Sequence, residues 1–205
     1  MKKMIVNILL FFLLLLEFSR NYMEPIYHEI IGVLLLILVI IHLVLNWSYM
    51  KNLTKGKYSL SRWILLIINL LFFISFFLSL IFGILSSRDL FPNLSLHNLT
   101  VISLHKVFSY ISLICMGLHL GTNFYVMFGK ISKKMNFTLK WILGIFIIGF
   151  GIYSFIDLDI VKHITGTYGF SIVTGNIIVS ILKYFSVVMM ISILTHIIYS
   201  NIRKG

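Results

Sequence analysis

The stretch 28-HEIIGVLLLILVIIH-42 places two histidines fourteen residues apart, at the two ends of an apolar segment. Along a helix, fourteen residues rise about 21 Å and rotate about 40° short of four full turns. His28 and His42 are therefore expected on one helix face, with one ring near each surface of a membrane. A polar ring in hydrocarbon is costly and usually faces the interior of a helix bundle or a functional site. The spacing thus predicts two polar partners elsewhere in the chain.

The rest of the chain has the composition of an integral membrane protein. Its 205 residues are 60% hydrophobic, with a mean hydropathy of +1.03. The single cysteine, Cys115, leaves no disulfide framework and no paired-cysteine metal site. Repeated apolar runs near twenty residues match the length of a helix that crosses a bilayer. We predict an all-α membrane bundle of about six transmembrane helices in one domain, with spans at 4–19, 28–50, 63–86, 103–128, 140–157 and 177–200.

The net charge of +11 is distributed unevenly between alternate loops. With the N-terminus inside, 12 of the 17 basic residues fall on the inner side, and all six acidic residues lie at or near the outer side. The positive-inside rule then predicts a multi-pass protein of the cytoplasmic membrane with both termini in the cytoplasm. The basic loops are read as orientation signals and lipid contacts, and nucleic acid is not expected as a partner. Residues 1–19 could instead be a cleaved signal peptide, but they lack an A-x-A-like cleavage site, which favours a retained helix.

The fourth predicted span supplies the partners, because 105-HKVFSYISLICMGLH-119 repeats the same histidine spacing. One span separates it from the second, so the two run in the same direction across the membrane. His28 is then level with His105 near the outer surface, and His42 with His119 near the inner surface. A facing pair of imidazoles in a bundle core is suited to axial ligation of haem iron. We predict two non-covalent haem b groups with these four histidines as iron ligands; the alternative is that the histidines form ordinary interhelical hydrogen bonds.

Glycines near the histidines are candidates for positions where a macrocycle fits between helices. Gly32 lies one turn after the first histidine, and Gly117 and Gly121 flank the last. Glycine is also common at ordinary contacts between membrane helices, so this prediction has a packing alternative. The haem-binding core is expected at about 24–157, with the helices at 4–19 and 177–200 accessory to it.

A local repeat indicates internal duplication. The segments 42-HLVLNWSYM-50 and 119-HLGTNFYVM-127 both read H-L-x-x-N-aromatic-x-x-M. Asn46 and Asn123, one turn after the inner histidines, could orient those ligands or cap their helices at the interface.

Three further histidines have weaker predictions. His97, in the loop before the fourth span, is an alternative outer ligand in place of His105. His163 in the outer segment is a candidate for a docking or quinone site. His196, near the inner end of the last span, either lines an inner quinone pocket or is a polar group that packs against a neighbour or reaches the interface. Whether residues 157–175 form a short interfacial helix or a loop stays open at this point.

The segments 28-HEIIGVLLLILVIIHLVLNW-47 and 105-HKVFSYISLICMGLHLGTNF-124 resemble the flavinylation-associated cytochromes, a bacterial family. The resemblance covers about residues 24–128 and rests on H-E-x-x-G, H-x-x-L-N-W and H-x-G in combination. It implies a di-haem b-type cytochrome that works beside extracytoplasmic proteins carrying covalently attached flavin mononucleotide, with the four histidines above as ligands. The last two spans and their outer connection match less clearly, which leaves the surface that would dock such a partner open.

Together, the residues and the resemblance predict a membrane cytochrome that transfers electrons across the cytoplasmic membrane. The exchange would link the quinone pool or an inner donor to an extracytoplasmic flavin-binding protein, in a direction that the sequence leaves open. One alternative is a haem-bearing anchor subunit of a larger oxidoreductase. Another is a non-redox transporter or proton channel with a histidine relay, against which the outer location of the acidic residues argues. No catalytic residue is predicted, so an electron-transfer subunit is expected rather than a stand-alone enzyme.

Overall fold

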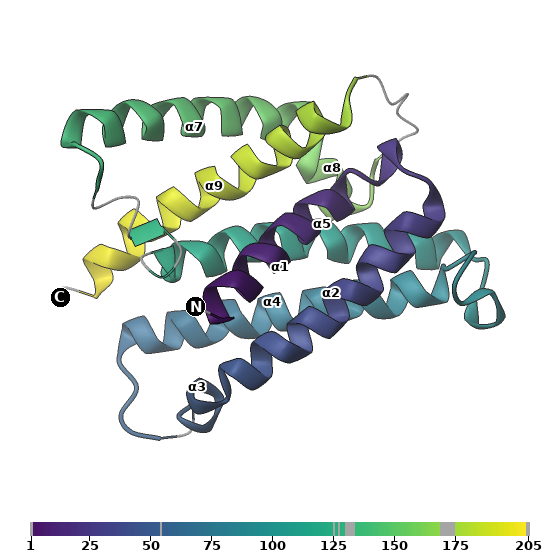
Figure 1. The fold of residues 1–205 in the computed structure, drawn as a ribbon, viewed down its shortest axis with the longest axis horizontal. Helices are drawn as coiled ribbons and strands as arrows, with labels where there is room; N and C mark the ends of the chain where they lie inside the picture. The colour runs from purple at the N-terminus through teal and green to yellow at the C-terminus, as the bar shows by residue number, and fades with distance from the viewer. Residues whose placement is uncertain are drawn as a thin grey trace.

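The computed structural model describes residues 2–53, 55–124, 126, 128, 129, 134–168 and 175–203. The helices are α1 (Lys2–Phe18), α2 (Pro25–Leu45), α3 (Trp47–Lys51), α4 (Leu60–Leu85), α5 (Leu99–Thr122), α7 (Phe137–Asp157), α8 (Ile160–Thr165) and α9 (Ile177–Ile202), with short 3-10 turns η1 (Arg20–Tyr22) and η2 (Pro92–Leu94) (Figure 1). Among the described residues, the five helices α2, α4, α5, α7 and α9 are long and apolar enough to cross a membrane. The 17-residue helix α1 reaches the short end of the usual range. The predicted helical membrane bundle is confirmed, and the predicted count of six is approximate.

Asparagine side chains set the ends of the two histidine helices. Pro25 opens α2, where its missing N–H costs nothing, and Asn46 ends that helix. The Asn46 side chain donates to the carbonyl of His42 over 2.8 Å, and Asn123 donates to the carbonyl of His119 over 2.9 Å. Both asparagines therefore cap their helices, as one of the two sequence interpretations holds. The span expected at 28–50 is consequently two helices, α2 and α3, which join at Asn46.

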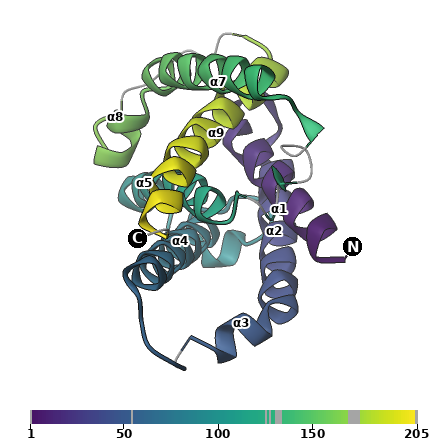
Figure 2. The same ribbon diagram turned by 90° about the vertical axis from the view of Figure 1, so that its left-hand side faces the viewer.

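Helices α4, α5, α9 and α7 pack side by side in that order, and α1 packs on both α2 and α9 (Figure 2). The centre of the bundle lies between α5 and α9, where Leu113, Val187 and Val188 are fully buried. A buried hydrogen bond of 3.0 Å from Ser186 Oγ to Ser154 Oγ joins α9 to α7. The C-terminal helices thus form a packed layer behind α5.

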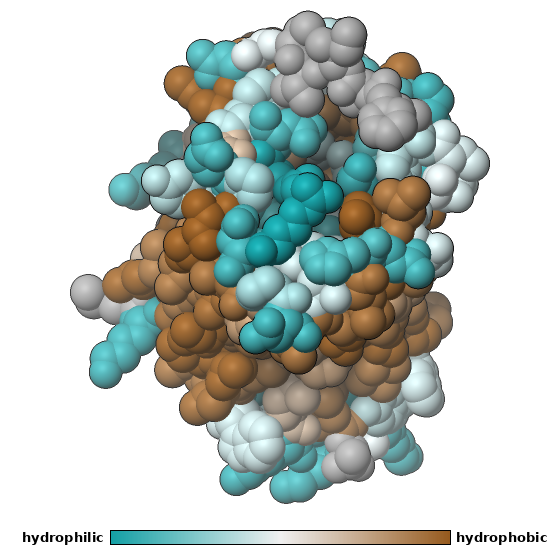
Figure 3. All heavy atoms as spheres, turned by 90° about the vertical axis from the view of Figure 1, so that its right-hand side faces the viewer, coloured by the Kyte–Doolittle hydropathy of each residue, from teal (hydrophilic) through white to brown (hydrophobic). Residues whose placement is uncertain are grey.

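The bundle has two distinct ends. We call the end with both chain termini and the turn between α3 and α4 the basic end, and the end with the α1–α2 and α4–α5 loops the far end (Figure 1). Figure 3 looks onto the far end, where hydrophilic side chains gather and apolar side chains lie around them. This pattern is typical of a loop region between apolar helix flanks.

Glu29 fastens the far-end loop to α2, a role that the sequence did not reveal. Its carboxylate accepts hydrogen bonds from Ser87 Oγ (2.7 Å) and from the backbone N–H groups of Arg88 (2.8 Å) and Leu90 (2.7 Å). A carboxylate with several donors is among the stronger anchors for a loop. The start of α2 and the end of α4 are therefore held together.

The segment after α7 contains a short helix, which answers part of the question left open above. Helix α8 packs on α5, after a left-handed residue at Asp159 (φ 48°) and before another at Gly166 (φ 71°). Residues 169–174 of the segment lie outside the described residues. Lys183, in the first turns of α9, pairs with Asp157, the last residue of α7, and its Nζ lies 2.7 Å from Oδ2 of that residue.

Candidate functional site: two pairs of histidines

The far-end pair brings together the histidines of α2 and α5 that start the repeated spacing. The ring centroids of His28 and His105 lie 6.0 Å apart, with the ring planes at 80°. His28 Nδ1 lies 2.8 Å from Oε2 of Glu17, a residue of α1. His105 Nδ1 lies 2.8 Å from the backbone oxygen of Ser79 in α4. Each ring is thus held from behind by the helix that precedes its own.

The basic-end histidines, His42 and His119, are anchored at Nδ1 in the same way, by different partners. His42 Nδ1 lies 3.0 Å from the side-chain oxygen of Asn7 in α1, and His119 Nδ1 lies 2.8 Å from that of Asn69 in α4. The His119 ring also contacts Phe72, with the ring centroids 5.6 Å apart, and it lies within electrostatic range of His42. Here too, α1 holds the histidine of α2, and α4 holds the histidine of α5.

All four rings therefore use the same nitrogen. Each Nδ1 faces an oxygen acceptor within 3.0 Å, and no Nε2 of the four has a hydrogen-bond partner among the described residues. Carbonyl oxygens only accept, so the hydrogen bonds of His42, His105 and His119 select the tautomer with its proton on Nδ1, and the Glu17 carboxylate lies at the same nitrogen of His28 as an ion-pair contact. The Nε2 lone pair of each ring is then available to a ligand or a metal.

The anchors reveal that the internal repeat extends over two helical hairpins. Asn7 and Glu17 are ten residues apart on α1, and Asn69 and Ser79 are ten residues apart on α4. Anchor and histidine are separated by 35 and 11 residues in the first hairpin and by 50 and 26 in the second. Both separations are 15 residues larger in the second hairpin than in the first. A longer loop between otherwise equivalent helices would produce this equal increase.

The sequence prediction missed these four anchors. A signal was present for three of them, because Asn7, Glu17 and Asn69 are polar residues within apolar helices. The haem-binding core was expected at about 24–157, with the first helix accessory to it. In the structure, α1 contacts two of the four histidines, whereas α7 packs on α9 and α8.

The three predicted glycines lie in different environments. A Cβ on Gly117 would come within 2.8 Å of Ile191, and one on Gly121 within 2.5 Å of Thr195, so both glycines allow α5 to pack closely on α9. Gly32 has no other atom within 4 Å of its Cβ position. A fourth glycine, Gly83 in α4, lies directly at the site, since a Cβ there would be 3.1 Å from the His105 ring.

Helix α2 lies apart from the packed layer along most of its length. Its close backbone packing is with α1 and α3, and Leu35 is the one buried residue among its 21. Side chains make its main approach to α5, including the ring contact between His28 and His105. The backbones of α2 and α5 are thus not closely packed along their length, and the two helices meet at the His28 and His105 side chains.

The remaining histidines lie elsewhere. His97 is exposed in the far-end loop and contacts Ser95 Oγ there, at 3.2 Å from its Nδ1. His163 stacks between Tyr110 and Tyr168, at centroid distances of 4.2 and 5.0 Å, and burial lowers its pKa. His196 stacks on Phe124 at 4.6 Å. None of these contacts joins a residue of the two histidine pairs.

Within the described ranges, no three His, Cys, Asp or Glu side chains gather as a bare metal ion would need. The sequence matches no protein-family model and no curated protein, and the fold matches no solved structure. Fold and site together define a helical membrane bundle in which the His28 and His105 rings are in contact and His42 and His119 lie on the same two helices toward the basic end.

Proposed function

We propose that this protein is a di-haem b-type cytochrome that transfers electrons across the cytoplasmic membrane. His28 and His105 would ligate one haem, and His42 and His119 the other. The basic end would face the cytoplasm, where the quinone pool or another donor meets the second pair. The far end would exchange electrons with an extracytoplasmic flavin-bearing protein, as the resemblance to flavinylation-associated cytochromes implies.

The proposal rests on a contact that all four histidine rings share, in which Nδ1 lies against an oxygen atom of a neighbouring helix. Histidines that bind a metal donate their other ring N–H to a carboxylate, a carbonyl or a similar acceptor, which fixes the tautomer and the orientation of the ring. All four rings have this contact at Nδ1 and keep Nε2 unpaired. A hydrogen bond between membrane helices contributes on average only about 0.6 kcal/mol, so stability alone explains this uniform pattern poorly.

The contact between the far-end rings also supports a cofactor held from two sides. The ring centroids of His28 in α2 and His105 in α5 lie 6.0 Å apart. Two imidazoles cannot hold a bare metal ion firmly, whereas haem would need only these two side chains from the protein.

The chain's own residues would orient the ligands and set their basicity. A bound haem supplies reversible one-electron exchange at its iron. Glu17 and the Ser79 carbonyl would fix the rings at the far end, and Asn7 and Asn69 those at the basic end. With fourteen residues between the histidines of each helix, the two pairs lie about 21 Å apart along the bundle, a distance that covers most of the hydrocarbon core.

The direct test is the dithionite-reduced minus air-oxidised absorption spectrum of the purified protein, with haem quantified per chain as the pyridine adduct. We expect two b-type haems per chain. A folded protein without haem, produced with an adequate haem supply, would overturn the proposal.

Single substitutions test the assignment of each ligand pair. His28→Ala or His105→Ala should remove one haem, and His42→Ala or His119→Ala the other, while each variant retains a haem at the other end. The matched control is His97→Ala, at an exposed loop position, which should retain both haems. Equal loss of both haems from every ligand variant, in protein that is still folded, would contradict two independent pairs.

A proton-conducting relay is the second candidate, and the contact between Glu17 and His28 favours it. A carboxylate that touches an imidazole inside a helix bundle is a typical element of a proton path. A haem-free, folded protein that acidifies proteoliposomes, and loses this activity with Glu17→Gln, would support the relay over the cytochrome.

A further inference from the structure

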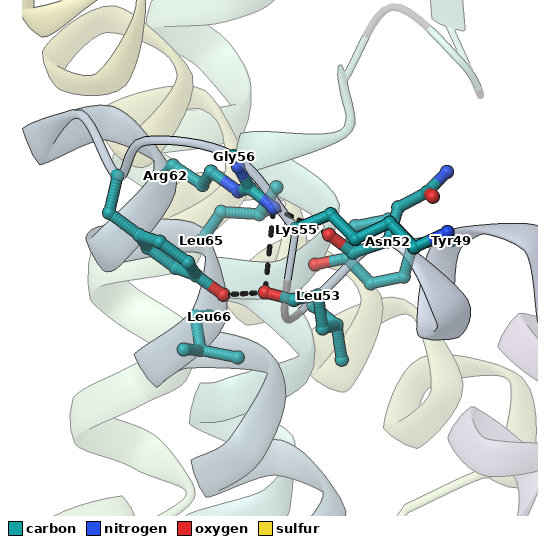
Figure 4. A pocket seen from close by; sticks show the side chains of 9 residues that line it. Tyr49, Asn52, Leu53, Lys55, Gly56, Arg62, Leu65 and Leu66 are labelled. Atoms are coloured by element: carbon teal, nitrogen blue, oxygen red, sulfur yellow. Dashed lines mark hydrogen bonds between the residues drawn. The ribbon is translucent and has the colours of Figure 1, made fainter.

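A pocket of about 510 Å³ lies at the basic end, between α3, the following turn and the start of α4 (Figure 4). Tyr49, Tyr58 and Arg62 line it together with the apolar side chains of Leu65 and Leu66. Small-molecule sites usually have volumes of 300–1,000 Å³ and combine apolar walls with a few polar groups. The pocket therefore has the size and the lining of a site for a one- or two-ring molecule.

Arg62 is part of the wall of this pocket. Its guanidinium donates to the backbone oxygens of Asn52 (2.5 Å), Lys57 (3.3 Å) and Leu53 (3.4 Å), and lies 4.2 Å from the centre of the Tyr58 ring. The Tyr58 hydroxyl donates to the carbonyl of Leu53 as well. Through these contacts Arg62 holds the turn in place and contributes a cationic side chain to the wall of the pocket.

Tyr49 offers the pocket a hydrogen-bond donor. Its oxygen accepts a hydrogen bond of 2.9 Å from the side-chain nitrogen of Asn69, and its own hydroxyl hydrogen has no acceptor among the described residues. Partial burial raises the pKa of Tyr49, so the hydroxyl stays protonated at neutral pH. The side chain is 39% exposed and thus accessible from the pocket.

The same asparagine connects Tyr49 to the candidate redox site. The side-chain oxygen of Asn69 lies 2.8 Å from Nδ1 of His119. Tyr49, Asn69 and His119 therefore form a continuous chain of two hydrogen bonds, from the pocket to one member of the basic-end pair.

We propose that this pocket binds the head group of a membrane quinol, with the Tyr49 hydroxyl donating to one ring oxygen and Leu65 and Leu66 contacting the apolar face. The apolar side chains of Leu65 and Leu66 and the hydrogen-bond chain from Tyr49 through Asn69 favour a quinol, and Lys55 and Arg62 complete the lining as cationic neighbours. The isoprenoid tail would stay in the lipid beside α4.

The inference deepens the proposed function and rests on it for the fate of the electrons. Oxidation of one quinol gives one quinone, two electrons and two protons. The two electrons would leave singly to two one-electron acceptors, a role that the proposed haem groups would supply. The two protons pass to water at the basic end, where the pocket opens.

Photoaffinity labelling of the full chain in lipid nanodiscs tests the pocket without relying on haem. The probe is an azido-naphthoquinone, with 2-methyl-1,4-naphthoquinone as competitor. We expect saturable labelling within residues 49–66 that the competitor suppresses. Tyr49→Phe, which removes one hydrogen bond, should weaken labelling about fivefold. Tyr27→Phe, an exposed tyrosine at the far end, is the matched control and should label like the parent protein.

Labelling that is spread over the lipid-facing helices and does not saturate would mean partition into lipid only, and would overturn the site. Unchanged labelling of Tyr49→Phe would overturn the role of Tyr49. Haem measured in the same samples separates the two proposals: two haems without saturable labelling would reject the pocket alone. Saturable labelling in folded, haem-free protein would reject the cytochrome alone.

Discussion

Gly121→Ala should destabilise the contact between α5 and α9. The new Cβ would lie 2.5 Å from Cβ of Thr195 and 2.6 Å from the backbone oxygen of Ser192. Carbon atoms pack best at about 3.5–4.0 Å, so the helices must separate by about 1 Å. Overpacking costs about 1–3 kcal/mol, and contact with backbone favours the upper value. Alanine returns about 1 kcal/mol through its higher helix propensity, which leaves a net loss of about 2 kcal/mol.

Gly32→Ala is the matched control in α2. A Cβ there meets no other atom within 4 Å, so the substitution should stabilise the helix by up to about 1 kcal/mol. In a chain of this size, 1 kcal/mol shifts the melting temperature by about 2–4 °C. We expect Gly121→Ala to melt about 4–8 °C below the parent protein, and Gly32→Ala at or slightly above it.

Cys115 provides the assay, because it is the single cysteine of the chain and is buried in α5. A fluorogenic thiol reagent in a heat ramp reports when this thiol becomes accessible. Equal melting temperatures for the two variants would refute the packing argument. A stable Gly121→Ala protein that has lost one haem would instead show that this glycine makes room for a cofactor.

Three further substitutions test individual contacts of the site. Gly83→Ala should displace the His105 ring by a few tenths of an ångström, and so alter the spectrum of the far-end haem while the other haem is unchanged. Asn69→Leu removes the oxygen that accepts from His119 Nδ1. The loss of such an orienting partner typically lowers metal affinity about 10–100-fold, so this variant should retain less haem at the basic end. Glu29→Ala should lower the stability by about 1–3 kcal/mol because it leaves the Ser87 hydroxyl and three backbone N–H groups without their acceptor, with faster proteolysis of the α4–α5 loop as the readout.

Two nearby positions serve as controls. Gly144 has no neighbour within 4 Å of its Cβ position, so Gly144→Ala should leave both haem spectra intact. Glu24 is exposed, and Glu24→Ala should leave the proteolysis rate unchanged. If a control variant changed its readout as much as the matched test variant, the change could not be assigned to the named contact.

The long helices were predictable because they are apolar runs near membrane-spanning length, and this signal needs no knowledge of the neighbours. The proximity of His28 and His105 was predictable too, since equal spacing on two parallel helices sets their register. The break at Asn46 was less visible: a local cap ends α2, while the apolar and aromatic character of the sequence continues into α3.

The faces of the helices were harder to predict than their positions. Gly117 and Gly121 flank His119 in sequence, yet they face α9, because residues two apart on a helix differ by about 200°. Gly83 lies in another helix and approaches His105 only after α4 and α5 pack. Contacts of this kind depend on the packing of several helices, which one sequence does not specify.

The two histidine hairpins offer the strongest argument for a shared purpose of the four rings. Hairpins α1–α2 and α4–α5 place an acceptor on the first helix and a histidine on the second, twice each, at matching intervals. The acceptors differ in chemistry: a carboxylate, a backbone carbonyl and two amides. What the four positions share is therefore the Nδ1 contact itself, and not a particular side chain. A requirement for an oriented ring with an available Nε2 explains that common feature, whereas ordinary helix association would not require the same ring nitrogen at all four positions.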